Sequence, residues 1–404
     1  MKIQKVIASD EIIELRTEGA STPIDASLFH LSVDDRIGFD LYVNAAEPDA
    51  ITQSIVNLTF VLPENFALLK DLIQPGSRVL DLGAHIGTFS LYAAAAGYCV
   101  LSVEASPSNV ALFKQSLLRN KFDSVKIVET AVSDYVGTAE FIVAGPHSLL
   151  ATPLLDNPRI TVPVTTVGDI LRIEGWDAVD FIKMDIEGAE VAAIRGMTDL
   201  LSTEHAPTIF YESNGHTLRM FDETPGRLMS VLEGFGYRCY LVEENRLIPY
   251  HSADLQTEVC VDYLATKHPL HDLSNWKICP PLSVSEKIDR ALQACTHPHQ
   301  HMRAYIVRAL ADTDAEILAD QRIKDVLEAL KYDVDADVRE AASWVKITGK
   351  PVFERLQELQ RALVEKDAEI ACLKDRVEAY ERGKFIRLMR FLSNFWRKYI
   401  LRIR

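Results

Sequence analysis

Short apolar runs alternate with helical stretches along the middle of the chain. From residue 78 onward, five runs have the length of a buried strand, and the stretches between them carry apolar residues at helical spacing. The runs are RVLDLG (78–83), CVLSVEA (99–105), VKIVETA (125–131), FIKMDI (181–186) and TIFYES (208–213). Strands that alternate with helices are typical of βαβ units, so we predict an α/β fold with a parallel, doubly wound sheet.

The segment before this region has a different pattern. Residues 1–60 alternate short apolar runs with turns, which predicts an N-terminal β-rich segment that contains a hairpin. The sheet domain is predicted over residues 61–268. Its last two apolar runs, at 237–244 and 259–265, suit a terminal antiparallel pair of strands.

The chain becomes purely helical after a connection rich in Pro and Ser. Residues 283–350 begin with a capping box at Ser283 and Glu286. Two similar helices follow at a spacing of 36 residues, and Arg303 in the first matches Arg339 in the second. This repetition predicts a helical domain of the HEAT-like type.

A heptad of apolar residues over 352–381 predicts a coiled coil. An exposed apolar seam is unfavourable, so the helix requires a partner. Either a second copy of the chain or a helix of another enzyme would serve. We therefore predict a homo-oligomer or a complex with a partner enzyme.

Charge is unevenly distributed along the chain. The formal net charge is -15, yet residues 382–404 carry eight Lys and Arg and no acid, which leaves 35 basic and 58 acidic residues elsewhere. The acidic body argues against nucleic acid as the main partner. If helical, the basic, aromatic-rich stretch 382–404 suits either an anionic membrane interface or the acidic body of the protein.

Length and cysteine usage bound the class of protein. With 404 residues and 48% hydrophobic content, the chain has enough apolar residues for a sizeable core and two or more domains. The first residues lack the apolar region of a secretory signal, and no run of about 18 apolar residues suggests a membrane span. The six cysteines are scattered and form no C-x-x-C pair, so we expect reduced thiols. We predict a cytoplasmic protein, located at the inner face of the membrane if the basic stretch binds lipid.

A glycine-containing turn follows the first strand of the predicted sheet. Asp81 ends that strand, and Gly83 and Gly87 open the next helix, where the backbone can approach a ligand closely. Glu104 ends the second strand, a position from which a carboxylate accepts hydrogen bonds from ribose hydroxyls. The combination predicts an adenosine ligand. The alternatives are a plain tight turn in which Asp81 caps the helix, and a nicotinamide dehydrogenase, although the loop is not G-x-G-x-x-G.

Four segments resemble the FkbM family of S-adenosylmethionine-dependent methyltransferases in order and spacing, over roughly residues 60–250. They are DLGAHIG (81–87), VEASPSNVALF (103–113), AVSDYVG (131–137) and DFIKMDIEGAE (180–190). The resemblance implies a class I, Rossmann-like methyltransferase fold with a seven-stranded sheet whose last strand is antiparallel. It also implies S-adenosylmethionine as the cofactor and O-methylation, often of sugars or secondary-metabolite hydroxyls.

The resemblance also assigns residues to parts of the cofactor. The loop from Gly83 to Gly87, with Asp81, Ala84 and His85, would line the methionine end. Glu104 and Ala105 would hold the ribose, and Glu129 and Ala131 would border the adenine. His85 stands where the general methyltransferase loop has its middle glycine.

A cluster of charges follows the strand at 181–186. Lys183 and Asp185 share one face of the strand, and the turn at Gly188 brings Glu187 beside Asp185. A hydroxyl acceptor needs a base or a metal, so Asp185 or Glu187 is a candidate base, and adjacent carboxylates also suit Mg²⁺. Lys183 is a candidate to steady the developing alkoxide or to fix the carboxylates. We interpret Glu190 as part of a structural ion-pair network.

Two further residues are candidates for contact with the acceptor. Glu212 ends the next strand and is placed to bind substrate hydroxyls, and His147 lies in a loop that could cover the substrate. The sequence thus predicts a methyltransferase that acts on a hydroxyl of a sugar, glycan or glycan precursor. The alternative is a scaffold with a degenerate methyltransferase domain that assembles partners through its helical region. Cys295 and the histidines up to His301 resemble a metal tract, but Pro298 favours a turn between helices.

Overall fold

The computed structural model describes residues 5–16, 23–47, 50–60, 64–142, 149–150, 159–270, 273–310 and 315–348. The predicted coiled coil at 352–381, the basic stretch at 382–404 and His147 lie outside the described residues.

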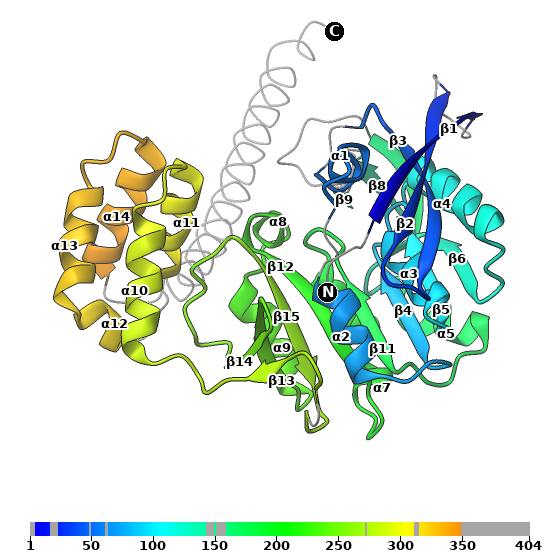
Figure 1. Ribbon diagram of the computed structural model, residues 1–404. Helices are drawn as coiled ribbons and strands as arrows, with labels where there is room; N and C mark the ends of the chain where they lie inside the picture. The colour runs from blue at the N-terminus through cyan, green and yellow to red at the C-terminus, as the bar shows by residue number, and fades with distance from the viewer. Residues whose placement is uncertain are drawn as a thin grey trace, which may run out of the picture.

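A nine-stranded sheet forms the centre of the molecule (Figure 1). In chain order its strands are β4 (Arg78–Leu82), β5 (Cys99–Glu104), β6 (Val125–Glu129), β11 (Phe181–Met184), β12 (Thr208–Asn214), β13 (Arg238–Glu243), β14 (Arg246–Tyr250), β15 (Cys260–Thr266) and β16 (Lys277–Ile278). The spatial order is β16-β14-β13-β15-β12-β11-β4-β5-β6. From β6 to β12 all pairings are parallel, and β15 is antiparallel to both β12 and β13. The seven strands from β6 to β13 confirm the predicted class I sheet, with one reversed strand.

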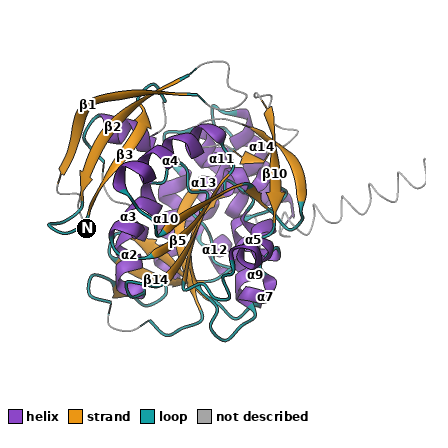
Figure 2. Ribbon diagram, turned by 90° about the vertical axis from the view of Figure 1, so that its right-hand side faces the viewer, coloured by secondary structure: helices purple, strands orange, loops and turns teal. Residues whose placement is uncertain are grey.

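Helices cover both faces of this sheet, which Figure 2 shows close to edge-on. One face carries α2 (Glu64–Leu72), α3 (Thr88–Ala95) and α4 (Pro107–Asn120). The other carries α5 (Val167–Glu174), α6 (Glu190–Arg195), α7 (Thr198–Leu201), α8 (Gly215–Met220) and α9 (Pro225–Gly234). Alternate strand residues serve the two cores, since Val79 and Phe181 face α2–α4 while Leu80 and Ile182 face the opposite layer. This double burial explains why the strands read as continuous apolar runs.

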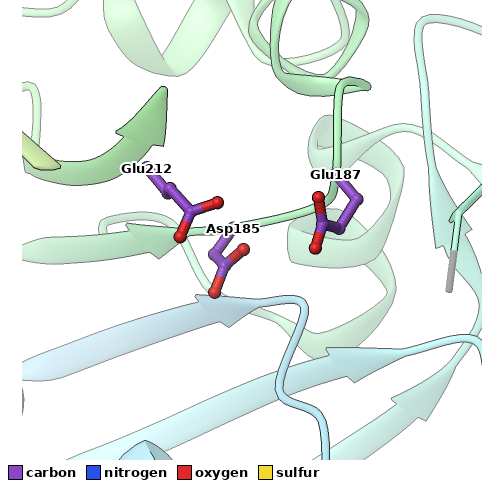
Figure 3. A group of neighbouring side chains, drawn as sticks. All are labelled: Asp185, Glu187 and Glu212. Carbon is purple, nitrogen blue, oxygen red and sulfur yellow. The ribbon is translucent and has the colours of Figure 1, made fainter. Parts of the chain in front are cut away.

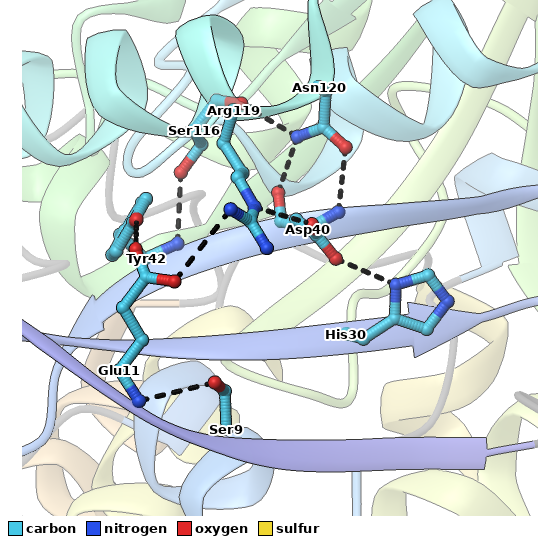
Figure 4. Close-up of polar contacts among 8 residues, drawn as sticks. All are labelled: Ser9, Glu11, His30, Asp40, Tyr42, Ser116, Arg119 and Asn120. Carbon is cyan, nitrogen blue, oxygen red and sulfur yellow. Dashed lines mark hydrogen bonds and ion pairs between the residues drawn. The ribbon is translucent and has the colours of Figure 1, made fainter.

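An antiparallel sheet of three strands forms the N-terminal segment. Its strands are β1 (Lys5–Leu15), β2 (Ile24–Ser32) and β3 (Gly38–Asn44), followed by α1 (Ala50–Val56). β3 is an edge strand of this sheet, and α4 covers its outer edge (Figure 4). The Asn120 amide accepts from Asp40 N at 2.8 Å and donates to Asp40 O at 2.6 Å, while Ser116 Oγ accepts from Tyr42 N at 2.9 Å. Arg119 adds an ion pair to Asp40 at 3.0 Å. Side chains thus satisfy the backbone groups of the sheet edge and hold the segment against the central domain.

A second small sheet lies beside the central one and was not expected from the sequence. It consists of β7 (Ala131–Val132), β8 (Gly137–Ile142), β9 (Leu149–Leu150) and β10 (Arg159–Thr165), in the order β7-β10-β8-β9. The helical stretch between the apolar runs at 181–186 and 208–213 forms two helices, because α6 and α7 are separated at Gly196. A Cβ at Gly196 would lie 2.4 Å from Ser133 O, so a neighbouring loop approaches the chain closely at this point.

The C-terminal helices form a domain with a hydrophobic core of its own. They are α10 (Val284–Cys295), α11 (Gln300–Leu310), α12 (Ala315–Ala319), α13 (Gln321–Leu330) and α14 (Ala336–Thr348). The matching arginines make matching contacts. Arg303 donates to the carbonyl oxygens of His297 and Pro298 at 2.8 and 3.0 Å, and Arg339 donates to those of Asp333 and Val334 at 2.7 and 2.9 Å. Within the described residues, no helix is long and apolar enough to cross a membrane.

Candidate active site

A cavity of about 490 Å³ opens at the carboxyl ends of β4, β5, β11 and β12. This is the edge at which doubly wound sheets bind their ligands, and the volume lies within the range of about 300–1,000 Å³ found for ligand pockets. Most of the residues that the sequence singled out line this cavity. They are Gly83, Ala84, His85, Glu104, Ala105, Ala131, Lys183, Asp185, Glu187 and Glu212.

Three predicted cofactor residues do not line the cavity. Asp81 is completely buried and accepts a hydrogen bond from Ser90 Oγ at 2.6 Å. Gly87 packs against the ring of Phe113. Glu129 is exposed and pairs with a lysine on α4, so Thr130 borders the cavity in its place.

Other residues line the cavity although no motif in the sequence identifies them. Ile51 and Phe60 come from the N-terminal segment, Leu150 from the small sheet, and Cys260 and Asp262 from the antiparallel strand β15. The pairing of β12 with β15 sets Asp262 opposite Glu212, which makes it part of the same wall. These residues reach the cavity through long-range pairing and packing.

The loop after β4 has an unusual backbone conformation. Gly83 and His85 have φ values of 79° and 53°. A Cβ at Gly83 would lie 1.8 Å from Asp185 O, so only glycine permits the loop to touch the end of β11. The left-handed conformation of His85 gives a physical reason why related loops place glycine at this position.

Glu104 organises the cofactor side of the cavity. Its carboxylate accepts from His85 N and Ser106 N, both at 2.8 Å, and from Asn109 Nδ2 at 3.4 Å. Burial raises the pKa of Glu104, while the two backbone N–H groups oppose that shift. Because each carboxylate oxygen has two acceptor sites, Glu104 can still accept ribose hydroxyls from the cavity.

Lys183 connects the cofactor loop with the catalytic candidates. Its Nζ donates to Gly83 O at 2.7 Å and lies 3.5 Å from Asp81 Oδ1 and 3.4 Å from Asp185 Oδ2. Burial alone would lower the pKa of Lys183, but the Asp185 and Asp81 carboxylates raise it above its ordinary value. The lysine is therefore a fixed cation that holds the carboxylates, which was one of the two predicted roles.

Three carboxylates converge on the acceptor side, as Figure 3 shows. One oxygen from each of Asp185, Glu187 and Glu212 lies within 4.8 Å of the other two. Glu187 has a φ of 52° in the turn after β11, which aims it back toward Asp185. Burial, with the charges of Asp185 and Glu187, raises the pKa of Glu212 to about 7. Such a cluster can accept hydrogen bonds from several hydroxyl groups, or it can hold a proton.

Glu190 has a structural position, as interpreted from the sequence, but its hydrogen bonds come from backbone N–H groups and not from an ion-pair network. Its Oε1 accepts from Ile186 N and Gly188 N, both at 3.2 Å, and so caps the turn that carries Glu187. Burial raises the pKa of Glu190 to about 8. The Cys295 to His301 tract holds no cluster of metal-ligand type, because the acidic group above is the one such set among the described residues.

The donor set fits an S-adenosylmethionine molecule. Glu104 faces the cavity at the tip of the second strand, and the Gly83 loop offers backbone groups beside it. When bound, the cofactor supplies an electrophilic methyl group on a sulfonium. The acidic side chains around the cavity suit that positive charge.

Part of the chain matches a known protein family. Residues 81–239 match the methyltransferase FkbM domain. A search of curated proteins found no match. Among solved structures, a precorrin-6Y C5,15-methyltransferase from Geobacter metallireducens is 13% identical, with a TM-score of 0.30, and covers 50% of this chain and 86% of that one.

Two further structures are similar at the same level. A SAM-dependent methyltransferase from Agrobacterium tumefaciens is 12% identical, with a TM-score of 0.33, over 60% of this chain and 70% of that one. A tRNA (uracil-54, C5)-methyltransferase from Pyrococcus abyssi, in complex with S-adenosyl-L-homocysteine, is 13% identical, with a TM-score of 0.31, over 64% of this chain and 44% of that one. The family match spans both the cofactor loop and the acidic turn after β11. Residues 81–239 therefore form a methyltransferase domain that matches the FkbM type, and the chain is an S-adenosylmethionine-dependent methyltransferase.

Proposed function

We propose that the protein transfers the methyl group to a hydroxyl of a sugar, glycan or glycan precursor. The observation that carries this proposal is the convergence of Asp185, Glu187 and Glu212 beside the cofactor wall. Several carboxylates in one cavity suit a ligand with several hydroxyl donors. The apolar part of the wall, which includes Phe60 and Phe210, suits the C–H face of a sugar ring.

The reaction needs a base because a protonated hydroxyl is a poor nucleophile. In the proposed step, the acceptor oxygen attacks the methyl carbon as its proton passes to a carboxylate oxygen of Asp185. The carbon–sulfur bond breaks, and the products are a methyl ether and S-adenosylhomocysteine. Lys183 holds Asp185 at 3.4 Å, so the base is fixed before the acceptor enters. Glu212 and Glu187 orient the hydroxyls.

The experiment is a screen of sugars and sugar conjugates, with products identified by mass and NMR. Asp185→Asn should then lower turnover at least ~10²-fold while S-adenosylmethionine affinity changes little. Asp199→Asn, on the exposed first turn of α7, is the matched control and should leave turnover unchanged. Near-normal turnover of the Asp185 variant would remove Asp185 as the base, and Glu187→Gln would be tested next.

Two alternatives have distinct outcomes in the same experiments. If Mg²⁺ on the three carboxylates activates the hydroxyl, dialysis against EDTA abolishes activity and added Mg²⁺ restores it. If the protein is a scaffold, calorimetry detects no binding of S-adenosylmethionine. The intact contacts of Glu104 and Lys183 argue against such a degenerate site.

A further inference from the structure

Two neighbouring strands, β12 and β15, form part of the acceptor side of the cavity. Glu212 of β12 and Asp262 of β15 stand opposite each other in the antiparallel pairing, and both line the cavity. The adjacent pair in the register, Tyr211 and Tyr263, points to the other face of the sheet, because side chains alternate along a strand. The two tyrosine rings stack with centroids 5.5 Å apart. Together β12 and β15 form the acceptor wall, and its position depends on what packs behind it.

The helical domain reaches the back of the acceptor wall through Tyr305 of α11. Tyr305 Oη donates to Gln256 Oε1 at 3.4 Å, and Gln256 Nε2 donates to Tyr263 Oη at 2.7 Å. All three side chains are buried. Because Tyr263 stacks on Tyr211, this chain of contacts connects α11 to both strands of the acceptor wall.

The same tyrosine also touches the chain where β12 ends. A Cβ at Gly215, the first residue of α8, would lie 2.4 Å from Tyr305 Cε2, so the ring lies directly on the backbone at this point. Gly215 N donates to Val259 O at 2.6 Å, which extends the pairing of β12 with β15 by one residue. A larger residue at position 215 would displace either the ring or the backbone. Tyr305 is therefore in contact with the end of β12 as well as with the partner of Tyr263.

The segment that leads into β15 is held by the helical domain too. Asp254 forms an ion pair with Lys287 of α10, and Leu255 packs into the hydrophobic core of the helical domain. Gln256, the next residue, is the one bonded to α11. β15 begins four residues later at Cys260, which lines the cavity. Three consecutive residues thus tie the start of this strand to the helical domain.

We propose that Tyr305 is a positioning residue for the acceptor, because it fixes β12 and β15 so that Glu212 and Asp262 are held in place. This inference rests on the proposed function for the chemistry of the acceptor. Tyr305 does not line the cavity, so it acts through the two strands. The candidate base Asp185 follows β11 and the cofactor loop follows β4, which lie one and two strands further into the sheet. A shift of the acceptor wall should therefore weaken acceptor binding and leave cofactor binding intact.

The first test separates acceptor binding from folding, using the sugar found in the acceptor screen. Tyr305→Ala removes the ring and the hydroxyl, and we expect the KM for the acceptor to rise at least ~10-fold while the KM for S-adenosylmethionine stays unchanged. Tyr305→Phe keeps the ring on Gly215 and should restore most of the acceptor affinity. A variant that merely contains less folded enzyme would instead show a lower apparent kcat with both KM values unchanged.

Leu330→Ala is the matched control for a cavity in the helical domain. Leu330 is buried in the core of that domain on α13, on the side away from the central sheet (Figure 1). Both KM values of this variant should equal those of wild type. A rise in the acceptor KM as large as that of Tyr305→Ala would overturn the proposal, because the effect would then come from the stability of the domain and not from the contact. An unchanged acceptor KM in folded Tyr305→Ala would overturn it as well.

The second test approaches the contact from the other side. Gly215→Ala places a methyl group against the buried Tyr305 ring, so the acceptor KM should rise. In a Tyr305→Ala background the ring is absent, and the added methyl group should have no further effect, since residues in contact are not additive. Gly234→Ala, at the end of α9, is the matched control, because a Cβ there meets nothing within 4 Å. Fully additive effects of the two substitutions would refute the ring contact as the link.

Hydrogen exchange gives a measurement that does not need an acceptor. Loss of the contact should speed amide exchange in β12 and β15 of Tyr305→Ala, while exchange in β5, on the far side of β4, stays unchanged. Unchanged exchange in β12 and β15 would overturn the positioning role whether or not an acceptor is known. If no sugar is methylated but exchange in these strands is faster, the proposed function fails and the positioning of the wall by Tyr305 is supported.

Discussion

Replacing Lys183 with methionine keeps the length of the side chain and removes the charge between Asp81 and Asp185. Asp81 is completely buried, and its remaining polar partner is Ser90. Removal of one partner from a buried ion pair costs about 3–5 kcal/mol, because the other charge stays buried without compensation. We expect the free energy of unfolding of Lys183→Met to fall by that amount.

A second substitution separates the effect of the uncompensated Asp81 charge from the effect of the changed side chain at position 183. Adding Asp81→Asn to Lys183→Met removes the stranded carboxylate, so the remaining cost is that of the unpaired Gly83 carbonyl, about 1–3 kcal/mol. The double variant should therefore be more stable than Lys183→Met alone. Urea unfolding measures the free energy of unfolding of both variants, and equal m-values make the two values comparable. Lys126→Met is the control, since its ion pair with Glu174 is exposed on the lysine side and is worth about 0–1 kcal/mol.

The pH dependence gives an independent check on the same reasoning. Burial raises the pKa of Asp81 even with Lys183 present, and the shift grows when the lysine is removed. A raised carboxyl pKa means that the folded state binds more protons than the unfolded state, so stability is lost as the pH rises through the folded pKa. Lys183→Met should be less destabilised at pH 5 than at pH 8. A loss below about 1 kcal/mol that does not change with pH would refute the role of Lys183 as the counter-ion of Asp81.

Four further predictions follow from the site and the C-terminal region. Glu104→Ala should weaken S-adenosylmethionine binding by about 1.5–3 kcal/mol in calorimetry, and unchanged affinity in a folded variant would remove Glu104 from the site. Since the pKa of Glu212 is raised to about 7, wild-type stability should fall as the pH rises from about 4.3 to 7, and Glu212→Gln should flatten that slope. If residues 352–381 form a coiled coil, light scattering should give a larger mass for the full chain than for a 1–350 truncation; equal monomer masses would contradict self-assembly. The basic stretch 382–404, if it anchors the protein, should be required for flotation with anionic vesicles.

The central sheet was predictable because its strands are buried on both faces. Each of the five apolar runs became a strand at nearly the predicted residues, and the reversed strand β15 was expected from the terminal pair. The small sheet was not predicted. Its strands β7 and β9 have two residues each, so they carry too little pattern to reveal a period of two.

At the adenine side, the residue that lines the cavity is the one directly after the predicted residue. Glu129 and Thr130 are neighbours at the end of β6, and alternate residues of an extended chain point in opposite directions. Glu129 therefore points to solvent and pairs with Lys114, while Thr130 reaches the cavity. The sequence identified the segment correctly but could not fix its phase, because an acid and a threonine are both compatible with a cofactor edge.

The charged residues around β11 show what an anomalous sequence pattern can and cannot reveal. Charges at the end of an apolar run predicted that a site lies there, since burial without a partner is costly. Their roles depend on partners from distant segments. Lys183 is a counter-ion because Asp81, 102 residues earlier, lies beside it, and Glu190 is a cap because the turn folds back over it. Asp185 and Glu187 line the cavity because the backbone of Gly83 lies against the end of β11, and Glu212 lies within 4.8 Å of both carboxylates. Whether a charged group is structural or functional thus depends on whether its neighbours enclose it or leave it at the cavity wall.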